Sequence, residues 1–132
     1  MLRFLGRTPI YWCAKRKSCV HTSTFGAEFT ALKKAVEEAI TIRYYLRSMG
    51  VALTKPTKIY GDNLSTITNA TEPSSALKKK HIALAYHFCR ENFAGNVVDV
   101  CKIDTKKNVS DPFTKALVSQ EFHGHMHETM DI

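Results

Sequence analysis

The chain has 132 residues and a mass of 14.9 kDa, which fits one domain with enough residues to bury a real core. Apolar residues make up 44% and charged residues 23%, which excludes wholesale disorder, and no apolar run approaches the ~20 residues of a membrane span. Lys and Arg outnumber Asp and Glu by 19 to 12, a net charge of +7 with a pI near 9.3. This balance favours a polyanionic partner, nucleic acid first.

The N-terminal residues contain no long apolar segment, so we expect no secretory signal. The cysteines are Cys13, Cys19, Cys89 and Cys101, and no two of them form a Cys-x-x-Cys pair. A zinc ribbon is therefore not expected. Without an export signal, buried free thiols in a reducing compartment are the expected state, although a Cys13–Cys19 disulfide stays an alternative.

The first half of the chain predicts strands followed by one long helix. Aromatic and β-branched residues from Phe4 to Cys13, broken at Gly6, indicate a strand or the ends of two strands around a turn. Residues 18–22 predict another short strand. A helix is predicted from Phe25 to Met49, with Gly50 as its stop. Its apolar stripe is Phe25, Phe29, Leu32, Val36, Ile40 and Tyr44.

The second half alternates strands and helices. We expect strands at 57–60 and 97–103, a short helix at 64–70 capped by Asn63, a long helix after Lys80, and a last helix near 110–117. The apolar stripe of the long helix is Ile82, Ala85, Tyr86, Cys89 and Phe93. The order predicts an α/β fold with a parallel or mixed sheet covered by helices. We assign residues 1–117 to the domain and 118–132, which are weakly patterned, to a C-terminal tail.

Three carboxylates stand out by their positions. Glu28 lies in the second turn of the long helix at the edge of its apolar stripe, Asp62 directly follows a strand, and Asp111 opens the last helix. Sites in open α/β sheets lie beyond the carboxyl ends of strands. Converging carboxylates repel one another unless a cation neutralises them, and hard divalent ions prefer such ligands. The alternative is structural: Asp62 and Asp111 as helix caps, and Glu28 as a complement to the helix dipole.

Five short sequence motifs follow one another along the chain in a recognisable order. They are Pro9–Lys17 (PIYWCAKRK), Thr22–Phe29 (TSTFGAEF), Ile59–Ser65 (IYGDNLS), Lys80–Glu91 (KHIALAYHFCRE) and Ser110–Lys115 (SDPFTK). Together they resemble the ribonuclease H domain of copia-type retrotransposon polyproteins. The resemblance extends from Pro9 to Lys115, and its specificity comes from the number and order of these motifs.

The resemblance implies a ribonuclease H-like fold and cleavage of the RNA strand of RNA–DNA hybrids with Mg²⁺, or Mn²⁺, as cofactor. Glu28 matches the family's helix glutamate, Asp62 its strand-end aspartate and Asp111 its last carboxylate. The expected partners are the hybrid and the reverse transcriptase domain of the same polyprotein, with no membrane. The implied location is intracellular, in the cytoplasm (in a virus-like particle) or the nucleus.

The family also carries an aspartate on a first, central strand, for which this chain has no match. That strand would lie upstream of Met1. Without it, we expect the strand near Ile59 to lose a neighbour and to expose unpaired amides, a hazard for association. We therefore predict that the isolated chain cleaves hybrids poorly or not at all.

Other residues are weaker candidates for binding. Lys78, Lys79, Lys80 and His81, together with Asn63, are assigned to nucleic-acid contacts, with a solvated basic helix start as the alternative. Tyr11 and Trp12 are expected to be buried strand aromatics rather than base-stacking residues. His123, His125 and His127 have the content of a metal site but lack a carboxylate framework, so ligation by them is not expected.

Two alternative functions stay open. The first is a catalytically dead remnant of a retroelement that at most binds nucleic acid, which the missing fourth carboxylate favours. The second is a ribonuclease H-like nuclease or integrase of another family, which the five motifs disfavour.

Overall fold

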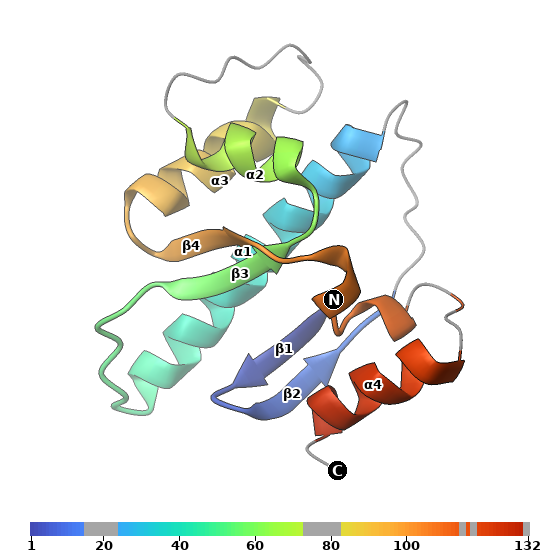
Figure 1. The fold of residues 1–132 in the computed structure, drawn as a ribbon. Coiled ribbons are helices and arrows are strands. Elements are labelled where there is room, and N and C mark those ends of the chain that lie inside the picture. The colour runs from blue at the N-terminus through green and yellow to red at the C-terminus, as the bar shows by residue number, and fades with distance from the viewer. Residues whose placement is uncertain (15–23, 73–82, 114–115, 117–118, 131–132) are drawn as a thin grey trace. The chain divides into compact units, whose positions relative to one another are not determined.

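The structure is a computed structural model that describes residues 1–14, 24–72, 83–113, 116 and 119–130 (Figure 1). The chain divides into two compact units. One comprises Met1–Val20 together with Ile103–Ile132, and the other comprises His21–Lys102. The strand predicted at residues 18–22 lies outside the described residues.

The first unit contains a β-hairpin. Strand β1 (Leu2–Leu5) pairs antiparallel with β2 (Thr8–Trp12), and mutual backbone hydrogen bonds of 2.9 Å between Met1 and Cys13 close the open end. The turn between the strands requires a positive φ of 64° at Gly6, where a residue without Cβ is favoured. The prediction of two strand ends around a turn is confirmed.

The C-terminal part of this unit differs from the prediction. Asp111–Phe113 form a single 3-10 turn where a helix to Leu117 was expected, although several residues between 114 and 118 lie outside the description. The segment interpreted as a weakly patterned tail contains helix α4 (Ser119–Met130), which packs against β2. Its sequence is rich in His and other polar residues, so it lacks the strong helical periodicity of apolar residues that would predict a helix. The boundary between a domain at 1–117 and a tail at 118–132 stays a prediction.

The second unit contains a parallel strand pair packed with helices (Figure 1). Its elements are α1 (Thr24–Ser48), β3 (Thr57–Gly61), α2 (Leu64–Thr71), α3 (Ala83–Ala94) and β4 (Val98–Lys102). The register of β3 and β4 runs from Thr57 beside Val98 to Gly61 beside Lys102. The predicted fold class is confirmed: the part of the chain that the structure describes is mixed α/β, consistent with a ribonuclease H-like fold that lacks one strand.

The core of the second unit lies between α1, α2, α3 and β4. Its largest fully buried side chains are Phe29, Val36, Cys89 and Val98. The stripe predicted on α1 is confirmed at Phe29, Leu32 and Val36, but it was wrong at Tyr44, whose side chain is 68% exposed. A spacing of four residues drifts around a helix of 3.6 residues per turn, so the buried face continues through Ala39 and Arg43 instead.

The side chain of Arg43 links α1 to the start of β3 by hydrogen bonds. Its guanidinium is buried and donates to the backbone oxygen of Lys55 at 2.8 Å and to the hydroxyl of Thr57 at 3.3 Å. We expect Arg43→Ala to lower the free energy of unfolding by about 2 kcal/mol, because hydrogen bonds to charged groups contribute more than neutral ones and a carbonyl loses its donor. Urea unfolding measures the change. The exposed Arg47 of the same helix is the matched control, and an equal loss in Arg47→Ala would contradict the assignment.

The pKa of the Cys89 thiol predicts how the free energy of unfolding depends on pH. The pKa of this thiol is raised from 9.0 to about 12. Burial is the largest cause, Lys33 lowers the pKa and Glu37 raises it. Above pH 9 the unfolded chain loses a proton that the folded chain keeps, so stability falls by about 1.4 kcal/mol per pH unit until about pH 12. Chemical denaturation between pH 8 and 11 measures this slope. Cys89→Ala should lack that part of the slope, and identical slopes in both proteins would contradict it.

Cys13, Cys89 and Cys101 are free thiols, but only Cys89 is buried as expected, since Cys13 and Cys101 are partly exposed; Cys19 lies outside the described residues. None of the helices in the described ranges combines the length and the apolar character that crossing a bilayer requires.

Candidate functional site

Asp62 lies at the carboxyl end of β3, at the point where the chain turns into α2. Asn63 follows as the N-cap of α2, and its side-chain oxygen accepts a hydrogen bond of 3.1 Å from the backbone N–H of Thr66. This cap confirms the predicted helix start and assigns the capping role to Asn63 rather than to Asp62. The Asp62 carboxylate is half-buried at the strand end, where ligands bind in open α/β sheets.

Glu28 lies half-buried in the second turn of α1, one residue before the fully buried Phe29. Helix α1 packs against β3, whose first residue contacts Arg43 in the second half of the helix. The strand therefore runs antiparallel to the helix, toward the half of α1 that carries Glu28 (Figure 1). The elements that carry Glu28 and Asp62 thus belong to one packed unit.

Asp111 lies in the other unit, at the start of the 3-10 turn. Its carboxylate is buried, with 7% of the residue exposed, and accepts a hydrogen bond of 3.0 Å from the side-chain amide of Asn108. The oxygen of that Asn108 amide in turn accepts bonds from the backbone N–H of Ser110 at 3.2 Å and from its hydroxyl at 2.7 Å. Residues 108–111 therefore form a small hydrogen-bonded loop that fixes the orientation of the carboxylate.

The three candidate carboxylates are thus divided between the units, with Glu28 and Asp62 in one and Asp111 in the other. Among the described residues, no group of three or more His, Cys, Asp or Glu side chains is arranged to hold a metal ion. The donor chemistry fits a hard divalent cation, because all three groups are carboxylates. Their convergence stays a prediction.

The residues assigned to nucleic-acid contacts are mostly beyond the described part of the chain. Lys78, Lys79, Lys80 and His81 all belong to the segment 73–82, which the structure does not describe. Asn63 is described, and the oxygen of its side chain is used by the cap of α2. Its role toward nucleic acid stays a prediction.

The histidines near the C-terminus lie on helix α4. His123 and His127 are exposed and one turn apart, whereas His125 is 8% exposed and, two residues from each of them, lies on a different face of the helix. These three side chains form no metal-ligating group, in agreement with the absence of a group of three anywhere in the described ranges.

The strand aromatics of β2 differ from the prediction. Trp12 is 63% exposed and Tyr11 is 40% exposed, so the expectation that both are buried was wrong. Among the described residues the hairpin forms a sheet of two strands, and so small a sheet buries few of its own apolar side chains.

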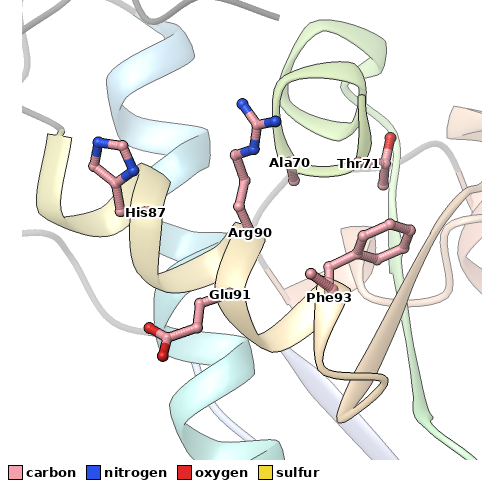
Figure 2. A pocket seen from close by; sticks show the side chains of 7 residues that line it. Ala70, Thr71, His87, Arg90, Glu91 and Phe93 are labelled. Atoms are coloured by element: carbon pink, nitrogen blue, oxygen red, sulfur yellow. The ribbon is translucent and has the colours of Figure 1, made fainter. Parts of the chain in front are cut away.

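A hollow of about 580 Å³ lies between α2 and α3, and sequence reasoning did not predict it. Its walls include Ala70 and Thr71 of α2 and His87, Arg90 and Phe93 of α3 (Figure 2). Arg90 extends toward α2 in Figure 2 and donates a hydrogen bond to the hydroxyl of Tyr86. The hollow contains none of the three candidate carboxylates, so it is distinct from the predicted site.

Comparison with known proteins identifies relatives for most of the chain. The retrovirus-related Pol polyprotein from transposon RE1 of Arabidopsis thaliana is 31% identical over 119 residues, which is 90% of this chain. This chain is a homologue of transposon Pol polyproteins. The Pol polyproteins from transposon RE2 of Arabidopsis thaliana and from transposon TNT 1-94 of Nicotiana tabacum are 32% and 31% identical, each over 86% of the chain.

The chain spans 8% of the length of each of these Pol polyproteins. No protein-family model matches it, and no solved structure matches it significantly. The comparison therefore supports an origin in a retroelement polyprotein.

Proposed function

We propose that this chain is a ribonuclease H domain of a copia-type retroelement Pol polyprotein, which in the intact polyprotein hydrolyses the RNA strand of RNA–DNA hybrids. The position of Asp62 is the observation that carries the proposal. Its carboxylate follows β3 directly and precedes the capped start of α2, within a segment that is homologous to transposon Pol polyproteins. A carboxylate at the end of a strand is well placed to act on a ligand beyond the sheet.

Glu28, Asp62 and Asp111 would hold Mg²⁺, with Mn²⁺ as a substitute. When bound there, the metal would supply an activated water and charge stabilisation for the leaving oxygen of a phosphodiester. The basic residues Lys78–Lys80, with His81 and Asn63, would hold the hybrid through its phosphates. The reverse transcriptase domain of the same polyprotein is the proposed partner in the chain.

Hybrid binding tests this proposal on the chain itself. We expect labelled RNA–DNA hybrid to bind more tightly than double-stranded DNA of the same sequence, with an affinity that falls steeply as salt increases, because the net charge is +7. Fluorescence anisotropy at several salt concentrations measures both properties. A preference for double-stranded DNA would overturn the proposal and favour an integrase-like function.

A second candidate function is a non-catalytic remnant that binds nucleic acid. The net charge of +7 favours it, because that charge suits binding to a polyanion whether or not the carboxylates act on the bound strand. Incubation of the hybrid with Mg²⁺ or Mn²⁺ distinguishes the two functions. Slow cleavage confined to the RNA strand supports the ribonuclease H proposal. Hybrid binding without cleavage supports the remnant only if cleavage is also absent after the chain is extended at Met1 with the residues that precede the matched region in a related Pol polyprotein.

A further inference from the structure

Strand β3 has one edge without a strand neighbour in the part of the chain that the structure describes. Its sheet contains β3 and β4 alone. The backbone N–H of Thr57 donates to the oxygen of Val97 at 3.0 Å, and Thr57 stands beside Val98 in the register. In a parallel pair, alternate residues of a strand direct their backbone groups toward the same neighbour. Ile59 and Gly61 therefore also face β4, while the N–H and C=O groups of Lys58 and Tyr60 face the opposite edge.

The side chains of this edge are accessible as well. Lys58 and Tyr60 are exposed, whereas Thr57, Ile59 and Gly61 are partly buried, and 57% of Tyr60 is accessible. Pro56 precedes the strand and has no N–H to donate, so it limits the length of the edge. The edge thus offers two donors and two acceptors between Pro56 and Asp62, with an aromatic ring beside a lysine.

We propose that this edge pairs with the same edge of a second copy of the chain. A twofold axis at Ile59 makes the two strands antiparallel and places Lys58 of each copy opposite Tyr60 of the other. Each such pair exchanges two backbone hydrogen bonds, so the edge satisfies all four of its donors and acceptors. The product is a sheet of four strands in the order β4, β3, β3 and β4, which is more stable than a sheet of two.

The side chains of the edge are compatible with this partner. Lysines on an edge discourage pairing when like charges face each other, but here each Lys58 lies opposite a Tyr60 ring, which attracts an ammonium group. The net charge of +7 on each copy opposes association over longer range. Added salt screens that repulsion, so we expect the dimer to tighten as salt increases. This dependence is opposite to the one expected for nucleic-acid binding.

Sedimentation and light scattering of the full chain over about a hundredfold range of concentration test the proposal. We expect a monomer that converts to a dimer as concentration rises. Tyr60→Pro should abolish the dimer, because it removes an N–H that faces the partner and leaves the bonds to β4 intact. Tyr60→Ala, which keeps the N–H and loses the ring, is the matched control and should weaken the dimer less.

Amide hydrogen exchange provides a measurement that needs no variant. The amides of Lys58 and Tyr60 should gain protection as concentration rises, whereas that of Ile59, bonded to β4, should be protected throughout. A chain that stays monomeric at every concentration overturns the proposal. Strong protection of Tyr60 in a monomer also overturns it, since another segment of the same chain then covers the edge. A dimer that survives Tyr60→Pro with unprotected Lys58 places the interface elsewhere and overturns it too.

Discussion

Extending the chain at Met1 with the residues that precede the matched region in the transposon RE1 Pol polyprotein is expected to raise hybrid cleavage by at least about 100-fold, or about 2.7 kcal/mol in activation free energy. The physical reason lies in the open edge of β3. An added strand can pair with Lys58 and Tyr60, and under the ribonuclease H proposal it would bring a further aspartate toward Asp62. Single-turnover cleavage of a labelled hybrid in Mg²⁺ measures the rate.

Two controls separate the contributions of the added strand. An extension of equal length made of Gly and Ser cannot form a stable strand and should leave the rate unchanged. The RE1-derived extension with its aspartate replaced by Asn should pair with the edge, keep the chain monomeric and still cleave slowly. If the RE1-derived extension forms the strand without any gain in cleavage, the ribonuclease H proposal fails and the remnant interpretation is favoured.

This experiment also separates the proposed function from the proposed dimer. The same β3 edge cannot accept an added strand and a second copy at once, so the extended chain should be monomeric where the shorter chain dimerises. A loss of the dimer without a gain in cleavage supports the edge assignment and contradicts the nuclease assignment. A gain in cleavage by the extended chain, when the shorter chain never dimerises, supports the nuclease assignment and contradicts the proposed dimer.

The sequence predicted those elements whose residues carry a local physical signal. The apolar period of α1 located a helix of 25 residues to within one residue at each end, and Asn63 predicted the start of α2 through its capping chemistry. Tyr44 and Arg43 show the limit of such patterns. An apolar residue four positions after Ile40 was assigned to the core, yet the buried position is one residue earlier and holds a hydrogen-bonded arginine.

The candidate site was predictable as three separate residues but not as a site. Asp62 is recognisable because a carboxylate directly follows a predicted strand, and Glu28 because it adjoins a buried stripe. Asp111 belongs to the other packed unit, more than 40 residues further along the chain, and no local pattern encodes whether it joins them. The hollow between α2 and α3 was missed for the same reason, because its walls come from segments more than 15 residues apart in sequence.

In the extended chain, Asp62→Asn is expected to lower hybrid cleavage by at least about 100-fold while changing the free energy of unfolding by less than about 1 kcal/mol. The substitution removes the negative charge that a divalent cation requires and keeps the size of the side chain. Asp62 does not cap α2, because the side-chain oxygen of Asn63 accepts the hydrogen bond from the N–H of Thr66, so the helix should be retained. Cleavage rates at several Mg²⁺ concentrations should show that excess metal restores part of the lost activity.

Asp104→Asn is the matched control for this substitution. Asp104 is an exposed carboxylate whose side chain accepts a hydrogen bond of 3.0 Å from the backbone N–H of Lys106, and Asn caps a turn about as well as Asp. It removes the same charge at a position outside the candidate site, so cleavage should stay within about twofold of the parent. Equal losses in the two variants would mean that net charge, acting through the affinity for the hybrid, governs the rate. A loss confined to Asp62→Asn, and relieved by Mg²⁺, would assign the metal to the end of β3.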